Sequence, residues 1–336
     1  MLRQVRLPIA LRSLASLVAG GILLTGAGLS PARAASVNLT LVAYSTPAPA
    51  YARIIPAFQK TKAGAGVTFT QSYGASSSQA AAVANGLHAD VVNLSLEPDV
   101  ATLVQRHLVA SNWYKNKYHG FVTDSTVVFV VRKGNPKHIH TWNDILKNGI
   151  GVITPNPFTS GSARWNIMAA YGAQIAQHKT KAQGVAYLRK LFNHVKVQND
   201  SASLAMQTFL TGEGNVLLSY EDEAVQAQQK GSPISYVVPP QSILIENPVA
   251  VTKEAASPKT ANAFVSYLYS RPAQEIFAQM GYWSVIPRVA REFTYPHPKT
   301  QFTIRQLGAW PKVQKQFFDP RTGIMAAIER KSGVQP

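Results

Sequence analysis

Short apolar stretches rich in β-branched residues alternate with segments of helical periodicity along most of the chain. The strand-like stretches cover residues 37–44, 67–71, 89–94, 126–132, 151–154, 195–197 and 216–220. Between them lie helix-like segments such as residues 51–59, where Ile54, Ile55 and Phe58 repeat at helical spacing. The last third, from residue 257, is mostly helical in pattern. This alternation predicts an α/β architecture.

Four of the predicted strands end in a turn of small hydroxyl or Gly residues that opens a helix. These turns lie at Ser45, Ser76, Ser160 and Ser201, and the string Ser-Ser-Ser-Gln from Ser76 matches a capping box. A helix N-terminus presents unpaired N–H groups and a positive dipole end, so each turn could hold an anion. Ser is also simply a preferred cap, which explains any one of these turns by itself. In open α/β sheets, ligands bind at the carboxyl ends of the strands.

Length and composition narrow the class of protein. The chain has 336 residues, 46% of them apolar, which fits a globular protein with two lobes better than one. It has no Cys, which excludes disulfides, Cys-ligated metals, thiol nucleophiles and a lipid-modified N-terminal Cys.

The N-terminus predicts a cleavable signal peptide over residues 1–34. Basic residues precede an apolar run over residues 14–29, and Ala32-Arg33-Ala34 offers a cleavage site. The apolar run is shorter than the roughly 20 residues that a membrane span needs. We therefore expect an exported, soluble protein located in the periplasm. Removal of the four arginines in this segment lowers the formal net charge from +17 to +13.

Two other functional classes find little support. The chain has no Gly-x-Ser-x-Gly elbow, phosphate-binding loop or His-Glu-x-x-His motif, so we expect no enzyme, no cofactor and no metal. The basic residues are dispersed, without a long Lys/Arg run, which argues against nucleic acid as a partner. The positive charge either raises the local concentration of anions or reflects an acidic medium.

Several strings, in this order, give the chain a family resemblance. They are Gln71-Ser72-Tyr73-Gly74-Ala75-Ser76, Ala89-Asp90-Val91-Val92, Val131-Arg132-Lys133-Gly134-Asn135-Pro136-Lys137, Thr154-Pro155-Asn156-Pro157 and Ser160-Gly161-Ser162-Ala163-Arg164-Trp165-Asn166. With them the chain resembles the periplasmic sulfate/thiosulfate-binding proteins of bacterial ABC importers, from about residue 41 to about residue 310. The Pro-Asn-Pro and Ser-Gly-x-Ala-Arg-Trp segments are specific to that family.

The resemblance implies a two-lobed, type II periplasmic-binding-protein fold of the Venus-flytrap kind. Two crossover hinge strands would join the lobes, near residues 123–127 and 245–249. Lobe I would comprise residues 35–122 and 249–336, and lobe II residues 123–248. The implied function is to capture sulfate, or thiosulfate, between the lobes and deliver it to the permease subunits of an ABC importer, with the binding protein acting as a monomer.

The resemblance also implies a set of neutral donors for the anion. Backbone N–H groups would come from Ser45, Ser160, Gly161, Ser162 and Ala202, and side-chain donors from Ser76 and Tyr220. Arg164 would not contact the anion itself, and its charge would be linked to this set through the backbone.

The chain departs from the family pattern at three of these positions. Ser45 stands where many members have Asp, Ser162 replaces the second Gly of a Gly-Gly pair, and Tyr220 replaces a Trp. A Tyr donor is also reminiscent of molybdate-binding relatives. Molybdate or tungstate therefore stays open as the alternative ligand.

Overall fold

A computed structural model describes residues 37–331, and the predicted signal peptide lies outside them. The strands are β1 (Asn38–Tyr44), β2 (Thr68–Gly74), β3 (Val91–Asn93), β4 (Phe121–Arg132), β5 (Val152–Pro155), β6 (Val195–Asn199), β7 (Val216–Tyr220), β8 (Ile234–Val237), β9 (Gln241–Val251), β10 (Trp283–Ser284) and β11 (Thr300–Phe302).

Helices follow most of these strands. They are α1 (Ala48–Gln59), α2 (Ser76–Ala84), α3 (Glu97–Gln105), α4 (Gly161–Ala176), α5 (Lys181–His194), α6 (Ala202–Leu210), α7 (Glu221–Gln229), α8 (Pro258–Leu268), α9 (Arg271–Gln279), α10 (Pro287–Ala290), α11 (Ala309–Phe317) and α12 (Ile324–Lys331), with short 3-10 turns η1 (Asp144–Leu146) and η2 (Ile304–Leu307). The predicted α/β alternation is confirmed.

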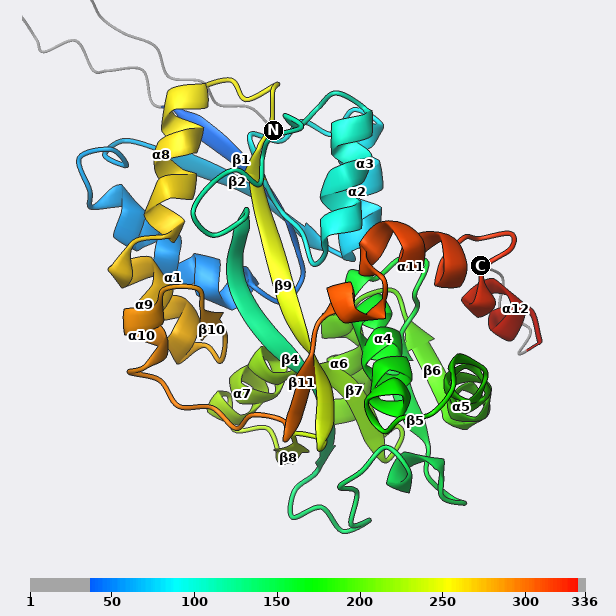
Figure 1. The fold of residues 1–336 in the computed structure, drawn as a ribbon. Coiled ribbons are helices and arrows are strands. Elements are labelled where there is room, and N and C mark those ends of the chain that lie inside the picture. The colour runs from blue at the N-terminus through cyan, green and yellow to red at the C-terminus, as the bar shows by residue number, and fades with distance from the viewer. Residues whose placement is uncertain (1–36, 332–336) are drawn as a thin grey trace, which may run out of the picture. The chain divides into compact units, whose positions relative to one another are not determined.

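The strands form two parallel groups joined by one antiparallel pair. Their order is β2-β1-β3-β9-β4-β7-β5-β6, with β8 and β10 also on β4, and β11 on β9 (Figure 1). β1 is parallel to β2 and β3, and β5 is parallel to β6 and β7. Only the long strands β4 and β9, antiparallel to each other, connect the two groups along this path.

The pairing of β4 with β9 brings the two predicted crossover segments together. Thr123 lies opposite Asn247, and Ser125 lies opposite Ile245. Beyond this stretch, β9 pairs with β3 from Val249, and β4 pairs with β7 from Val127. β9 therefore attaches to the first group and β4 to the second, and their pairing joins the two groups. The predicted lobe boundaries stay a prediction.

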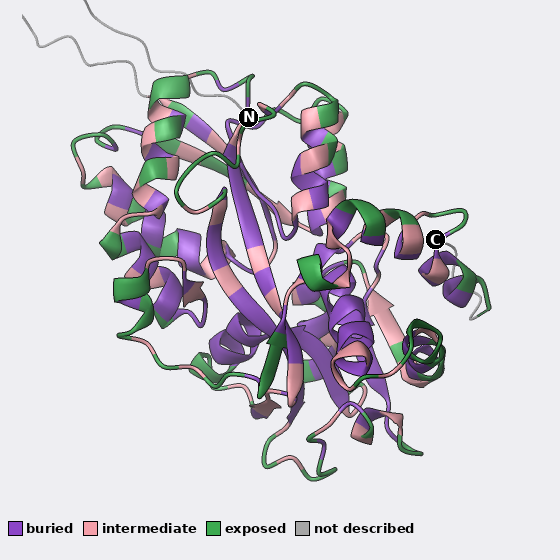
Figure 2. Cartoon of the chain, in the orientation of Figure 1, coloured by how far each residue is buried: buried purple, intermediate pink, exposed green. Residues whose placement is uncertain are grey.

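Side-chain alternation places helices on both faces of the first group. Leu39 and Leu41 of β1 pack into a buried cluster with α1, α8 and α9, whereas Val42 packs with α2 and α3. Successive side chains of a strand point to opposite faces, which explains the division. Figure 2 shows these helices buried on the side facing the strands and exposed on the other.

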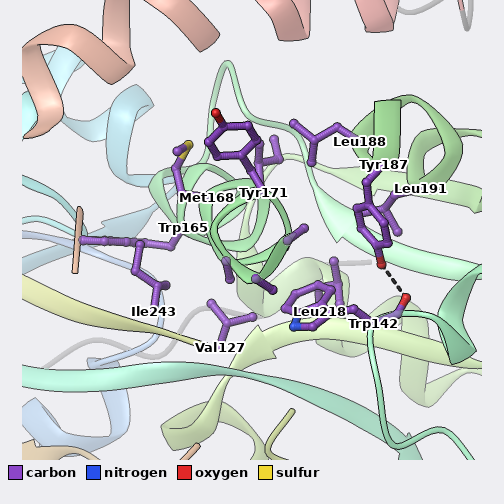
Figure 3. Packing of buried hydrophobic residues seen from close by; sticks show 14 of the residues in the cluster. Val127, Trp142, Trp165, Met168, Tyr171, Tyr187, Leu188, Leu191, Leu218 and Ile243 are labelled. Carbon is purple, nitrogen blue, oxygen red and sulfur yellow. Dashed lines mark hydrogen bonds between the residues drawn. The ribbon is translucent and has the colours of Figure 1, made fainter. Parts of the chain in front are cut away.

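The second group repeats this arrangement. Phe129 of β4 packs with α4 and α5, and Val130 packs against α6 and α7 on the opposite face. Figure 3 shows the larger of these clusters, where Tyr187 of α5 donates a hydrogen bond to the Trp142 carbonyl. Helix α4 is buried over nearly its whole length.

The C-terminal helices join this larger cluster. Trp310 of α11 lies edge-on to Trp165 with ring centroids 4.7 Å apart, and Phe317 packs against Tyr171 at 4.8 Å. Buried residues between positions 302 and 328 therefore pack in the same cluster as α4.

Two local features differ from the sequence prediction. Helix α5, for which no element was predicted, begins with a complete capping box between Thr180 and Gln183. The predicted capping box at Ser76 is wrong, because the N-cap of α2 is Ala75 in extended conformation, without a side-chain bond. The Ser76 hydroxyl bonds to Asp99 instead.

Helix α7 begins with three buried carboxyl groups, Glu221, Asp222 and Glu223. The Ser125 hydroxyl donates to Asp222 Oδ1 at 2.8 Å, and the Ser219 hydroxyl donates to Glu223. Within residues 37–331, no Lys or Arg forms an ion pair with any of the three. Burial raises the pKa of Glu221 and Asp222 to about 7 and the pKa of Glu223 to about 8.

These raised values predict an unusual pH dependence of stability. The unfolded carboxyls titrate near pH 4, so between about pH 4 and 8 the folded protein binds more protons than the unfolded chain. Stability contributed by these groups is therefore lost as the pH rises through about 7 to 8. We expect a higher melting temperature at about pH 5.5 than at about pH 8.5.

A matched pair of variants tests whether Glu223 causes this pH dependence of the melting temperature. Glu223→Gln keeps an acceptor for Ser219 without the titrating group, and should narrow the difference between the two melting temperatures. Glu254→Gln, at an exposed position, should leave it unchanged. An equal or lower melting temperature at the acidic pH would contradict the assignment.

Candidate functional site

The predicted turns meet at one small cavity at the carboxyl ends of the parallel strands. Its lining residues are Tyr44, Ser45, Gly74, Ala75, Ser76, Ser95, Ser160, Ser162 and Ala202. Five predicted ligand residues are among them, namely Ser45, Ser76, Ser160, Ser162 and Ala202. Gly161 lies between two lining residues, and Tyr220 is set behind the cavity wall. Segments far apart in sequence are thus brought together at one point.

The size and charge of the cavity restrict what it can hold. Its volume is about 10 Å³, far below the roughly 300–1,000 Å³ of sites for organic ligands. None of its lining residues carries a charge. Within residues 37–331, no cluster of His, Asp or Glu is placed to hold a metal ion. A ligand of a few heavy atoms, held by neutral groups, fits these limits.

Three helices begin at the cavity wall. Helix α2 starts at Ser76, α4 at Gly161 and α6 at Ala202. The first N–H groups of a helix have no intrahelical acceptor, and they lie at the positive end of the helix dipole. In α6 the Ser201 hydroxyl accepts the Leu204 N–H at 3.3 Å, which leaves the Ala202 N–H at the cavity wall.

The N-terminus of α4 corrects one predicted donor. The Ser160 N–H donates to the Asn156 carbonyl at 2.9 Å, closing the turn that follows β5. Ser160 is therefore not a free backbone donor, and the free N–H groups of this turn begin at Gly161 and Ser162. The Ser160 hydroxyl lies 3.2 Å from the Ser162 hydroxyl, so both side chains still line the cavity as neutral polar groups.

Gly161 marks a close approach between the two strand groups. A Cβ at this position would lie 2.6 Å from Leu96 Cδ2 and 2.8 Å from Ser95 Oγ. Ser95 and Leu96 follow β3 of the first group, whereas Gly161 opens α4 of the second. Any larger residue at this position would have to displace the Leu96 and Ser95 side chains.

Ser76 has a different set of contacts from the predicted one. Its hydroxyl donates to Asp99 Oδ2 at 2.5 Å and accepts the Ser95 N–H at 2.8 Å. The hydroxyl proton is thus directed at Asp99, away from the cavity. The N–H groups of Ser77 and Ser78 donate to the Thr159 carbonyl, which ties α2 to the turn before α4.

Arg164 and Asp99 place opposite charges behind the cavity wall. Arg164 is buried, and its Nε donates to the Pro157 carbonyl at 2.7 Å. Burial lowers the pKa of Arg164, and the nearby Asp99 counteracts this. Burial raises the pKa of Asp99, whereas Arg164 and the Ser76 and Ser77 hydroxyls lower it. The guanidinium is therefore near enough to Asp99 for the two charges to interact, and it bonds to the turn before α4 through the Pro157 carbonyl.

Tyr220 reaches the cavity only through Ser95. The two hydroxyl oxygens lie 2.7 Å apart, and either can be the donor. Burial raises the pKa of Tyr220 well above its usual value, so the phenol stays neutral and can donate. Trp165 and Asn247 both donate to the Ser95 carbonyl, which holds this residue in place.

Sequence reasoning missed Ser95 and Asp99. Ser95 follows β3 and precedes α3, so it occupies a fifth turn of the same kind as the four predicted ones. The position of Ser95 between a strand and a helix could therefore have identified it from the sequence. Asp99 lies inside the first turn of α3, and its contact with Ser76 depends on tertiary packing.

Comparisons with known proteins agree with this geometry. Residues 39–283 match the family model described as bacterial extracellular solute-binding protein. A sulfate-binding protein of Synechococcus elongatus is 40% identical over 84% of each chain. A thiosulfate-binding protein of Pseudomonas aeruginosa is 34% identical over 90% of this chain and 94% of its own.

A solved structure extends the likeness to three dimensions. The sulfate-binding protein SubI of Mycobacterium tuberculosis is 43% identical and superposes with a TM-score of 0.82, covering 84% of this chain and all of that one. The predicted two-lobed, type II periplasmic-binding-protein fold is thereby confirmed. The chain therefore belongs to the bacterial extracellular solute-binding proteins, within the family of sulfate- and thiosulfate-binding proteins.

Proposed function

We propose that this protein captures sulfate, or thiosulfate, in the small cavity between its two lobes and delivers it to an ABC importer. The observation that carries the proposal is the convergence of three helix N-termini on one small cavity with no charged lining residue. The relatives described above are named for sulfate and thiosulfate, which favours these anions over molybdate or tungstate.

Helix dipoles supply the electrostatic part of the proposal. Each helix N-terminus is equivalent to roughly +0.5 of an elementary charge, so α2, α4 and α6 together offset most of a dianion. They do so without a titrating counter-ion. Hydrogen bonds from N–H groups to an ionised acceptor contribute about 1.5–3 kcal/mol each.

The contacts refine the predicted donor set. Backbone N–H groups of Ser45, Gly161, Ser162 and Ala202 remain donors in the proposal, and Ser76 contributes through its position at the start of α2. The Ser95 hydroxyl takes the place predicted for Tyr220, with the Tyr220 hydroxyl donating to Ser95 from behind. This order leaves the Ser95 proton for the anion.

Export, the cellular location and the partners complete the proposal. After removal of residues 1–34, the protein would act as a periplasmic monomer that docks on the permease subunits of the importer. Across residues 37–331, none of the helices combines the length and apolar character that a membrane span needs. The hinge would lie in the β4–β9 pair, with residues 302–328 moving together with α4.

Calorimetric titration of the ligand-free protein tests the proposal directly. We expect sulfate to bind with one site per chain, and phosphate to bind about 5- to 150-fold more weakly, because its remaining proton lacks a fixed acceptor in a cavity of donors. Thiosulfate, molybdate and tungstate complete the panel. Absence of sulfate binding would contradict the function, and equal affinity for phosphate would contradict the donor-only cavity.

Variants of Ser95 and Tyr220 test which of the two hydroxyls contacts the anion directly. Ser95→Ala should weaken sulfate binding by about 10- to 150-fold, because it removes a hydrogen bond to a charged group. Tyr220→Phe leaves Ser95 in place and should have a smaller effect. A larger loss in Tyr220→Phe than in Ser95→Ala would instead assign direct contact to Tyr220.

Gly161→Ala tests the close approach of the lobes. The added methyl would collide with Ser95 and Leu96 when the lobes close, so sulfate affinity should fall by about 5- to 150-fold. The melting temperature of the ligand-free protein should change little. Gly151→Ala is the control, since its nearest neighbour would be the flexible Lys196 side chain at 3.0 Å. Unchanged affinity in Gly161→Ala would show that the contact is not needed for binding.

A further inference from the structure

A second pocket lies beside the β4–β10 pair and shares no lining residue with the anion cavity. It is lined by Asp124, Leu244, Tyr282, Trp283, Ser284, Ala290, Phe293, Tyr295, His297 and Gln301. Its walls come from β4, β9, β10 and the segment that leads from α10 to β11 (Figure 1). Its volume of about 280 Å³ lies near the lower end of the roughly 300–1,000 Å³ of sites for organic ligands, which suits a small molecule.

Aromatic rings dominate the walls, and their polar tips are already bonded. Trp283 Nε1 donates to Glu221 Oε2 at 2.7 Å, and the Tyr295 hydroxyl donates to the Ala278 carbonyl at 2.5 Å. The Trp283 and His297 rings lie 4.3 Å apart at 57°. What the pocket offers to a ligand is therefore mainly ring surface.

One carboxyl group stands among these rings. Asp124 lies on β4 directly opposite Trp283 of β10, and within residues 37–331 no hydrogen bond satisfies its side chain. No Lys or Arg lines the pocket, although the chain has 33 of them against 16 acidic residues. The other charged neighbours are acidic or His: Glu246 faces Asp124 across the β4–β9 pair, Glu221 lies behind Trp283, and His297 forms part of the wall.

We propose that this pocket is a binding site for a small organic cation of the ammonium type. Ring faces attract a cation through their quadrupole, most strongly when it is desolvated, and Trp is the best of these partners. Asp124 supplies the opposite charge.

The pKa of Asp124 supports the assignment of this pocket to a cation. Burial, together with Glu246, raises the pKa of Asp124 to about 8. A cation bound beside Asp124 lowers this pKa again, because the positive charge stabilises the charged carboxylate. Cation binding therefore releases a proton below about pH 8 and is tightest above that pH.

Choline and its neutral isostere 3,3-dimethylbutan-1-ol separate charge from shape. We would titrate both into the sulfate-loaded full chain at about pH 8.5, where Asp124 is mostly charged, and follow heat and tryptophan fluorescence. Choline should bind with one site per chain, and at least about fivefold more tightly than the alcohol. Equal affinity of the two, or no choline binding up to about 10 mM, would overturn the proposal.

Two variants locate the site. Asp124→Asn should weaken choline binding about tenfold, and sulfate titration of the same variant reports separately on the anion cavity, which Asp124 does not line. His297→Ala removes the exposed ring beside Trp283 and should reduce choline affinity by about two- to fivefold without loss of folding. Unchanged choline affinity in both variants would place the cation elsewhere and refute the assignment. Because sulfate binding is measured on the same samples, a failure of this proposal is distinguishable from a failure of the anion site.

Discussion

The antiparallel pairing of β4 with β9 is the constraint on which the rest of the molecule depends. One part of each strand pairs with a strand of a parallel group, β9 with β3 and β4 with β7. The adjoining parts pair β4 with β9. Because β3 and β7 attach to these strands, the carboxyl ends of both parallel groups come to the same place. The turns after β1, β2, β3, β5 and β6 can then line one cavity, although they are up to about 160 residues apart.

The charged groups near that cavity do not line it. Hydroxyls and helix N-termini form the wall, while Asp99 and Arg164 do not line it and interact with each other through their charges. A neutral wall does not compete with the anion for its donors, and helix dipoles require no desolvated counter-ion. At the start of α7, Asp222 and Glu223 likewise accept hydrogen bonds from hydroxyls, and burial favours their protonated form at moderate pH.

The aromatic pocket at β10 has the opposite electrostatic character. It combines the Asp124 carboxyl group with ring faces, in a protein whose net charge is strongly positive. On β4, Asp124 and Ser125 are neighbours and point to opposite faces. Ser125 bonds to Asp222 on the side of α7, and Asp124 opens into the pocket.

The amino-acid sequence by itself determined the order of strands and helices and the positions of the hydroxyl-rich turns, because both follow from local periodicity and local capping preferences. Local signals of this kind are enough to assign Ser45, Ser76 and Ala202 to turns that open helices at the ends of strands. They do not show that the Ser76 proton faces Asp99 or that Tyr220 lies behind Ser95. Those outcomes depend on which helices and strands pack together, and a hydrogen bond between residues distant in sequence has no periodic signal. Only the tertiary structure decided them, because packing chooses one partner for each donor among several of equal chemical type.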